Sequence, residues 1–380
     1  MSTRNKRLTK TRKSKAKRKS LRYRRSPSLV LYWRGEELVF ENFAIGARIS
    51  AAPVVCEILH HCSNWRSLEE LTRVLAHYQP RSISPALRQL HRRGILQSSL
   101  RDTDPRENAM EAWSPWNPAA GYFHFSTKDQ AFAMDHFGAF QALKRRAKLD
   151  PMPLPVKNYP RAPRTALARS AGNSEFVQVL RNRRTWRKFS ASPVAQRDLG
   201  EILDLTFGIQ HWVDVPGLGG AATKTSPSGG GLHPIEAYVV VCRVRGLRRG
   251  IYHYNPKQHQ LEWLRSGLSR DALKKNLGNQ WWFADAAFFV LMTAVFPRTR
   301  WKYHYPRVYR AILLEAGHLC QTFCLSATWR GLAPFCTIAL ADSQWEKLLG
   351  IDGVNESILY AAGAGVRPPD ERGAHLMKLK

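Results

Sequence analysis

The chain has 380 residues, of which 44% are hydrophobic, so it is long enough to form two folded units with buried cores. Lys and Arg outnumber Asp and Glu by 59 to 29, which favours anionic partners over cationic ones. The longest apolar run, residues 286–296, is too short to cross a bilayer, so we expect a buried strand there and no membrane-spanning helix.

Residues 1–28 form a basic tail. Residues 1–25 contain thirteen Lys or Arg, no acidic residue and few apolar side chains, which is typical of a disordered segment. We expect it to solubilise the chain or to contact polyanions weakly. Arg34, Glu36 and Glu37 interrupt the apolar run that a signal peptide needs, and the six cysteines form no CxxC pair, so we expect a cytoplasmic protein.

The pattern of residues 29–100 predicts a winged-helix-like module. The expected elements are strands at 29–33 and 37–43 and helices over 53–61, from Ser67, and from Ser84 to the residue before Gly94. Ser67 and Glu70 have the spacing of a capping box. Such modules often bind DNA, and Arg88, Arg92 and Arg93 on the third helix could contact phosphates; the alternative is purely structural support.

Residues 101–172 predict a connector rich in proline and aromatic residues. Trp113, Trp116 and the aromatic run 122–125 are expected to fix it to the surface of a domain. The proline-rich residues 151–155 are expected to be extended. Nothing in this segment indicates chemistry.

Helices and strands alternate irregularly over residues 173–368, which predicts an α+β sandwich, and residues 369–380 form a second tail. The string from Gly217 to Ala222 has the letters of a dinucleotide-binding loop. No strand is expected before it and no helix after it, so we reject a Rossmann site.

A dense group of cations opens this region. Five Lys or Arg fall within residues 181–188, around Thr185. Arginine binds phosphate through two parallel N–H donors, and a threonine hydroxyl adds another donor. We therefore expect Arg183, Arg184, Thr185 and Arg187 to bind a phosphate; the alternative is a solvated helix end.

A glycine loop follows. Pro227 and Ser228 set a turn, and Gly229, Gly230 and Gly231 allow the backbone to approach a flat ligand closely. The loop leads into an apolar strand.

A run of basic and aromatic residues, 300–310, precedes a long helix over 308–330. The helix is apolar nearly all round, so we expect it to be buried on all sides. Glu315 and His318 are three residues apart and are expected to form a buried hydrogen-bonded pair. Cys320 and Cys324 are expected to pack as apolar side chains, and we expect no metal site.

These motifs resemble the nitroreductase superfamily, in particular its SagB-type thiazoline and oxazoline dehydrogenases. The resemblance is strong over residues 173–368 and weak before them. Arg183, Thr185 and Arg187 match an Arg-x-Ser-x-Arg/Lys motif with threonine in place of serine, and the glycine loop matches the flavin-facing loop. The resemblance implies an FMN cofactor, with Arg367 near a C-terminal phosphate-binding position, and a homodimer with FMN between its subunits.

Lys302 and Tyr303 resemble the Lys-Tyr motif of these dehydrogenases. The implied reaction oxidises an azoline ring in a ribosomally made precursor peptide to an azole, by removal of a proton and transfer of a hydride to flavin N5. A neighbouring ammonium favours the phenolate form of a tyrosine, so we expect Lys302 and Tyr303 to accept the proton as one unit. The resemblance also allows a cyclodehydratase partner, without requiring one, and allows the module over 29–100 to capture the precursor as an added strand.

Two alternatives stay open. One is an NAD(P)H-dependent reductase of the same fold acting on a nitroaromatic, quinone or dehydroamino acid. The other is a nucleic-acid- or peptide-binding protein with an inactive flavin domain, in which the basic tail and the first module do the work.

Overall fold

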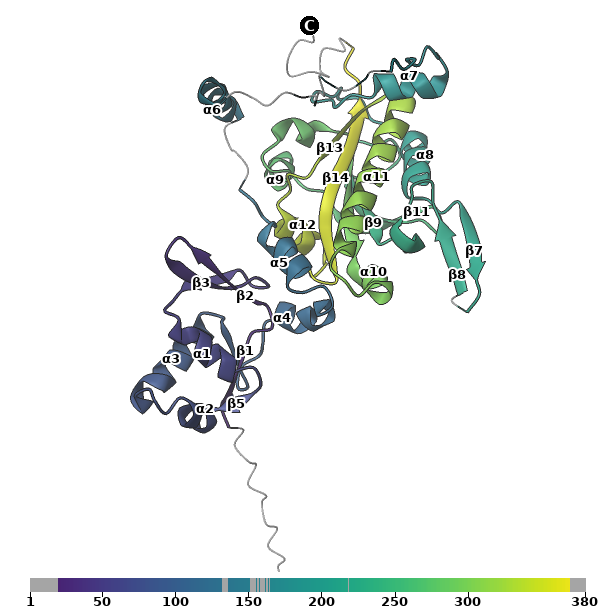
Figure 1. Cartoon of the computed structure of the whole chain (residues 1–380). Helices are drawn as coiled ribbons and strands as arrows, with labels where there is room; N and C mark the ends of the chain where they lie inside the picture. Colours follow the sequence, from purple (N-terminus) through teal and green to yellow (C-terminus); the bar gives the residue numbers. More distant parts are fainter. Residues whose placement is uncertain are drawn as a thin grey trace, which may run out of the picture. The chain divides into compact units, whose positions relative to one another are not determined.

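The computed structural model describes residues 20–131, 136–150, 155, 157, 161, 163, 165–217 and 219–369. The chain divides into two compact units, Met1–Ala112 and Trp113–Lys380 (Figure 1). The predicted boundaries at 100/101 and 172/173 differ from this division, because most of the connector belongs to the second unit. Most of the predicted tails at 1–28 and 369–380, and most of the proline-rich run 151–155, lie outside the described residues.

The first unit contains two small antiparallel sheets, with strand orders β5-β1-β6 and β2-β3-β4, and a group of helices. Its elements are β1 Arg22–Arg25, β2 Leu29–Arg34, β3 Glu37–Asn42, β4 Ala47–Ser50, α1 Val54–His61, β5 Arg66–Ser67, α2 Leu68–Val74, α3 Pro80–Arg92, β6 Leu96–Ser98, α4 Pro105–Ala109 and η1 Met110–Trp113. The expected strands at 29–33 and 37–43 and the first helix are confirmed. The winged-helix interpretation stays a prediction.

The predicted disorder of residues 1–28 is wrong at its C-terminal end. Strand β1 pairs with β5 and β6. The side chain of Tyr23 is 3% exposed in the core of this unit, while the Arg24 guanidinium donates to the side chain of Gln97 at 2.8 Å. The buried Tyr23 side chain and pairing on both sides therefore hold this strand in place.

The capping box at Ser67 and Glu70 is confirmed. Helix α3 begins at Pro80, four residues before the expected start, and Pro85 lies inside it. Proline is well suited to the first helical position, so Pro80 starts the helix. Burial of Leu87 and Leu90 offsets the backbone hydrogen bond that Pro85 cannot make.

The second unit is built on a six-stranded antiparallel sheet with strand order β11-β10-β9-β12-β14-β13. Its elements are α5 Ala119–Ser126, α6 His136–Leu149, α7 Glu175–Asn182, α8 Gln196–Phe207, β7 His211–Val215, β8 Gly219–Thr223, η2 Gly229–Gly231, β9 Ile235–Val241, β10 Gly250–Asn255, β11 Gln260–Ser266, α9 Arg270–Asn276, η3 Trp281–Asp285, β12 Phe288–Val295, α10 Phe296–Lys302, α11 Val308–Trp329, β13 Leu332–Thr337, α12 Asp342–Leu349 and β14 Glu356–Val366. This mixture confirms the α+β class. No helix in the described ranges is long and apolar enough to span a membrane.

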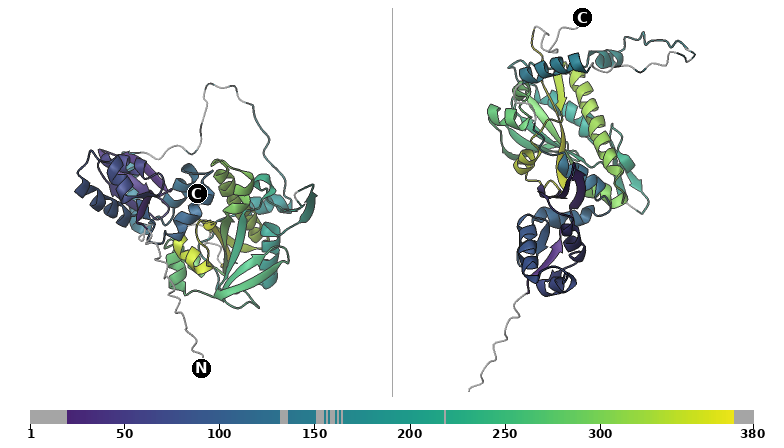
Figure 2. Two further views of the ribbon diagram at one scale, coloured as in Figure 1. Left: turned by 90° about the horizontal axis from the view of Figure 1, so that it is seen from below. Right: turned by 60° about the vertical axis from the view of Figure 1, so that its left-hand side comes forward.

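Helices cover both faces of this sheet (Figures 1 and 2). Strand β12 shows the two faces, because Phe288 contacts Phe323 of α11, whereas Phe289 contacts Phe335 in the core beneath α9 and α12. Burial on both faces explains the uninterrupted apolar run that predicted this strand. Helix α8 packs against α11 on the first face.

Helix α11 is not buried on all sides within one chain, contrary to the expectation. An exposed stripe runs along it at helical spacing: Arg310, Leu313, Leu314, Gly317, His318 and Gln321. The side chain of Leu314 is 62% exposed, and no atom lies within 4 Å of the position that a Cβ would take at Gly317. The stripe is an exposed, partly apolar surface.

The hairpin β7–β8 was absent from the expected elements. Gly217 lies in its turn with a φ of 77°. A strand does precede the dinucleotide-like string, contrary to the expectation, but a strand rather than a helix follows it. The string therefore offers no helix N-terminus to a dinucleotide phosphate.

The aromatic part of the connector is fixed to the second unit. Trp113 and Trp116 are fully buried, and the Nε1–H of Trp113 donates to the carbonyl oxygen of Val354 at 2.9 Å. His124 lies beside them, with Nδ1 2.7 Å from the hydroxyl of Tyr309 and Nε2 3.2 Å from the carbonyl oxygen of Gly353. A neutral imidazole satisfies both contacts, and burial lowers the pKa of His124 from 6.5 to about 3.

We expect the stability of the second unit to fall with acidification because of His124. The unfolded chain binds a proton at this residue below pH 6.5 and the folded chain does not until about pH 3, so this contribution is fully present above pH 6.5 and is lost as the pH falls. Between pH 7.5 and 5, the free energy of unfolding of the wild type should decrease by about 2 kcal/mol more than that of His124→Gln. Denaturant titrations at both pH values measure this, and parallel pH profiles would contradict it.

Candidate functional site

The glycine loop runs along α11 toward the N-terminus of that helix. The Ser226 hydroxyl lies 2.7 Å from the hydroxyl of Thr322, and the Ser228 hydroxyl donates to Oε2 of Glu315 at 2.5 Å. One step further, a Cβ added at Gly229 would lie 3.3 Å from the Cβ of Ala311. Successive loop residues thus contact successive turns of the helix, which fixes the direction of the loop.

Glu315 anchors the loop rather than pairing with His318 as expected. Nδ1 of His318 lies 3.4 Å from the carbonyl oxygen of Pro227, so Glu315 and His318 both hold the loop. Burial raises the pKa of Glu315, while the bond from Ser228 and the nearby charge of Lys224 act in the opposite direction. The Ser228 hydroxyl also accepts from the N–H of His233 at 2.9 Å, so it closes the turn.

The predicted catalytic pair meets the loop at Gly230. This glycine has a φ of 72°, and its carbonyl oxygen lies 3.4 Å from Nζ of Lys302. A Cβ here would be only 2.5 Å from the hydroxyl of Tyr303, so no other residue fits without displacement of the pair. The structure therefore brings Lys302, Tyr303 and the glycine loop together.

Lys302 and Tyr303 lie at the C-terminal end of α10, where the backbone leaves the helix. Both side chains can then point to one side, which adjacent residues of a strand cannot do. Nζ of Lys302 lies 5.4 Å from the centre of the Tyr303 ring. The ammonium and the phenol thus occupy one small region.

Trp116 holds the backbone of this pair. Its Nε1–H donates to the carbonyl oxygen of Tyr303 at 2.9 Å, and its side chain is fully buried. Sequence reasoning missed this role, because the two residues are 187 positions apart and no local pattern connects them. The only signal was the aromatic density of the connector.

A cavity of about 760 Å³ opens beside the pair, between hairpin β7–β8 and α10. Its lining includes Trp212, Lys224, Gly230, Gly231, His233, Glu236, Arg298, Trp301 and Lys302. Glu236 is bonded to Arg298 and to His253. Burial lowers the pKa of Lys224 and lowers that of His233 to about 4, so the imidazole of His233 is neutral at pH 7. Two tryptophans and several cations therefore face this space.

The predicted phosphate-binding residues lie at the other end of α11. Residues 183–190 belong to no helix or strand, and the N–H of Trp186 donates to the carbonyl oxygen of Pro334 at 2.9 Å. Arg183, Thr185 and Arg187 are partly buried. Arg184 is exposed and instead donates to the carbonyl oxygens at the end of α7, so it caps that helix.

Arg367 joins this group. Its Nε–H donates to the carbonyl oxygen of Leu332 at 3.0 Å, and its guanidinium lies 5.5 Å from the centre of the Trp186 ring. Within the described ranges, Arg183, Arg187 and Arg367 form no ion pair with a carboxylate. A group of cations without acidic partners fits a phosphate dianion.

The arginine group and the glycine loop do not come together within one chain. The glycine loop reaches Ala311, whereas Arg367 contacts the carbonyl of Thr328, 17 residues later on the same helix. At 1.5 Å per residue this separation is about 25 Å. Figure 1 shows α10 at one end of α11 and α7 at the other.

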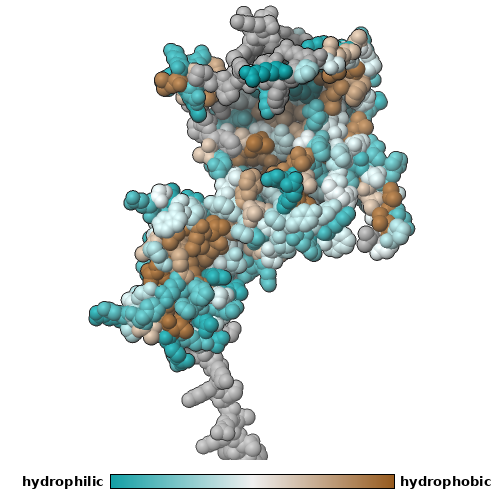
Figure 3. Space-filling view, viewed as in Figure 1, coloured by the Kyte–Doolittle hydropathy of each residue, from teal (hydrophilic) through white to brown (hydrophobic). Residues whose placement is uncertain are grey.

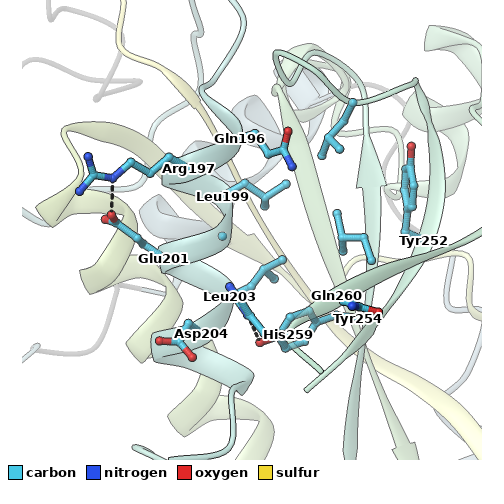
Figure 4. Close-up of a pocket in the computed structure, with 13 residues that line it drawn as sticks. Gln196, Arg197, Leu199, Glu201, Leu203, Asp204, Tyr252, Tyr254, His259 and Gln260 are labelled. Atoms are coloured by element: carbon cyan, nitrogen blue, oxygen red, sulfur yellow. Dashed lines mark hydrogen bonds and ion pairs between the residues drawn. The ribbon is translucent and has the colours of Figure 1, made fainter. Parts of the chain in front are cut away.

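A second cavity, of about 750 Å³, lies between α8 and the hairpin β10–β11 (Figure 4). Tyr254 and His259 are hydrogen-bonded at 2.8 Å in its wall, and Arg197 pairs with Glu201 at its rim. None of the predicted site residues lines it. It is therefore separate from the candidate site.

Three of the cysteines come together in space, a proximity that the sequence analysis did not predict. Sγ atoms of Cys320, Cys324 and Cys336 lie within 4.8 Å of one another. Sequence spacing could not reveal this, because Cys336 is on β13, which returns alongside α11. Hydrogen bonds from Cys320 and Cys324, together with the positive charge of Arg183, lower the pKa of Cys336.

Residues 180–366 match the nitroreductase family. A nitroreductase homologue of Methanocaldococcus jannaschii, MJ1384, is 33% identical over 182 residues, which cover 47% of this chain and 85% of that protein.

Two bacterial proteins are similar over shorter stretches. The trifolitoxin-processing protein TfxB of Rhizobium leguminosarum bv. trifolii is 33% identical over 142 residues, which cover 36% of this chain and 38% of TfxB. The microcin B17-processing protein McbC of Escherichia coli is 29% identical over 141 residues, which cover 35% of this chain and 50% of McbC. The match thus spans half or less of these two relatives.

Because the similarity to MJ1384 extends over 85% of that protein, and the family match spans residues 180–366, the chain belongs to the nitroreductase family of flavin-dependent oxidoreductases.

Proposed function

We propose that this protein is an FMN-dependent dehydrogenase of the SagB type, which oxidises azoline rings in a ribosomally made peptide to azoles. The observation that carries the proposal is the meeting of Lys302 and Tyr303 at Gly230, beside a cavity walled by tryptophans. A reductase that only relays hydride has no evident need for this pair. The similarity to TfxB and McbC, which process trifolitoxin and microcin B17, supports a peptide substrate.

The cofactor site is completed by a second copy of the chain. The exposed stripe on α11 is apolar at Leu313 and Leu314 and has a glycine, Gly317, near its middle, which permits close approach of another helix. An antiparallel α11 from a second copy brings the arginine group of one chain to the glycine loop of the other. The homodimer then has two FMN sites, each built from both chains.

Arg183, Thr185, Arg187 and Arg367 would hold the phosphate of FMN, and the loop from Pro227 to Gly231 of the second chain would lie against its ring. Bound FMN would supply the acceptor for the hydride that leaves the azoline ring. Gly230 and Gly231 both have positive φ, and their lack of side chains leaves room for a flat ring.

The remaining chemistry falls to Lys302 and Tyr303. Aromatisation also removes a proton from the azoline ring, and a base must be within hydrogen-bond reach of it. The Tyr303 hydroxyl adjoins Gly230, and the Lys302 ammonium beside it stabilises the negative charge that the phenol oxygen gains on losing its proton. Trp116 keeps the backbone of Tyr303 in place for this transfer.

The cavity beside this pair suits a short, extended piece of peptide that carries planar rings. Trp212 and Trp301 offer aromatic faces, and hairpin β7–β8 forms one wall.

In the first unit, β2 and β4 are edge strands, and Leu31 and Trp33 on β2 are exposed. An edge strand of this kind can pair with a precursor peptide, and Figure 3 shows apolar patches that interrupt the polar surface of both units. A cyclodehydratase would supply the azoline.

The shared cofactor site can be tested by complementation between chains. The double variant Arg183→Ala/Arg187→Ala damages the arginine group, and Gly230→Ala damages the loop, so each homodimer should bind FMN poorly. Mixed dimers contain one site with both defects and one with neither, so about half of the wild-type flavin content should return. Differently tagged chains, co-expressed and purified in tandem, give the flavin content by absorbance. No recovery would show that both groups act within one chain and would contradict the proposal.

Removal of the proton acceptor should separate flavin binding from turnover. Lys302→Ala and Tyr303→Phe should keep the flavin spectrum but slow azole formation by at least about 100-fold, because general base catalysis contributes on this scale. Mass spectrometry follows the loss of two hydrogens per ring. His304→Ala, which changes an exposed neighbour, should retain activity. Wild-type rates in Tyr303→Phe would remove its assigned role.

Trp116 should act on turnover through Tyr303. Trp116→Phe removes the donor to the Tyr303 carbonyl, a bond worth about 1 kcal/mol, so kcat should fall about 5-fold with little change in KM. Trp113→Phe is a matched control, since that tryptophan is equally buried and donates to the carbonyl of Val354 instead. Equal effects of the two substitutions on kcat would indicate a general packing role for Trp116.

A further inference from the structure

We propose that Cys320, Cys324 and Cys336 form a binding site for one soft, thiophilic metal ion, such as Cu(I) or Zn(II). The three Sγ atoms lie within 4.8 Å of one another and come from two different elements, α11 and β13. This site is separate from the azoline chemistry of the proposed function and does not depend on it.

The fold creates the cluster in three steps. Cys320 and Cys324 are four residues apart on α11, so they lie on one face of the helix. The chain turns back at Gly331, which has a φ of 70°, and β13 then packs against α11. Cys336 is on the face of β13 opposite to Phe335, so its thiol points toward the two helical cysteines while Phe335 enters the core beneath α9.

The spacing fits a three-sulfur metal centre. A Zn–S bond is about 2.3 Å, so three sulfurs around one ion lie about 4 Å apart. The observed limit of 4.8 Å is less than about 1 Å longer than this spacing. A disulfide requires an S–S distance of about 2.05 Å, and all six cysteines of the chain are free.

Two of the three thiols are buried, and the third can be reached from solvent. Cys320 and Cys324 are 3% and 4% exposed, whereas Cys336 is partly exposed and leaves a path for an ion to enter. The Tyr360 hydroxyl donates to Sγ of Cys336 at 3.4 Å, as hydrogen-bond donors around metal ligands do.

The ligand set selects the class of metal. Soft thiolates favour Cu(I) and Zn(II) over Mg(II), Ca(II) or Mn(II), which prefer oxygen. Three protein ligands with one partly open side suit a trigonal Cu(I), or a Zn(II) that takes a water as its fourth ligand. Both ions bind through the same three thiolates, and metal titrations compare the affinities of the site for them.

The test uses the reduced full-length protein, freed of metal by a chelator. Zn(II), Cd(II) as a spectroscopic probe of thiolates, and Cu(I) are titrated in separate experiments with a competing chelator. We expect one ion per chain, with a charge-transfer absorption for Cd(II) that corresponds to three thiolates and a first shell of three sulfurs by X-ray absorption. The relative affinities for Zn(II) and Cu(I) identify the preferred ion.

Cys336→Ser should weaken metal binding at least about 100-fold. Loss of a hydrogen bond to a metal ligand already lowers metal affinity by about 10- to 100-fold, and loss of the ligand itself should cost more. Cys56→Ser, which removes an exposed thiol in the first unit, should leave the affinity unchanged. Circular dichroism confirms that the variants are folded, and the sulfur count on the wild type tests the site without any substitution. Failure of the wild type to bind any of the ions, a shell with fewer than three sulfurs, or equal affinity in folded Cys336→Ser would overturn the proposal.

Discussion

The length of α11 is the constraint on which the candidate site depends. Along its 22 residues, the glycine loop makes contact at Ala311 and the arginine group at Thr328, 17 positions later, which is a separation of about 25 Å. Because its buried face packs on the sheet, the separation is fixed by rigid structure rather than by a loop that could close. A ligand that needs both groups must find them on two chains, and the exposed stripe on the opposite face of α11 is the surface on which a second chain can supply them.

Helix α11 also determines how the loop is presented. The bonds to Thr322 and Glu315 align the loop with the helix, and this alignment delivers Gly230 to Tyr303. The connector completes the arrangement from outside, because Trp116 fixes the carbonyl of Tyr303 and Trp113 fixes the neighbouring turn at Val354. Residues from three distant parts of the sequence thus set the position of one phenol group.

Local signals made several of these elements predictable. The capping box at Ser67, the doubly buried run of β12 and the close spacing of Lys302 and Tyr303 are all contained in short stretches, so the sequence alone identifies them. Contacts across long sequence distances were not accessible in this way. The bond from Trp116 to Tyr303 and the approach of Cys336 to Cys320 depend on how the chain returns to α11, which no spacing within a segment encodes. The resemblance implied a cofactor site between subunits, but neither motif encodes how far apart the two predicted cofactor-binding groups lie along α11.

The charge of Glu315 and the position of the glycine loop depend on each other. Burial favours the protonated carboxyl, whereas the Ser228 hydroxyl and the N–H of Gly229 favour the carboxylate. If the loop moved away, the carboxylate would lose these donors. The ionised form therefore stabilises the ordered loop, and the ordered loop stabilises the ionised form. Lys224 strengthens this coupling, because its own burial is offset by Glu236 and Glu315. A buried acid beneath a glycine loop is thus a means of keeping a flexible backbone in one conformation while leaving its outer surface free of side chains.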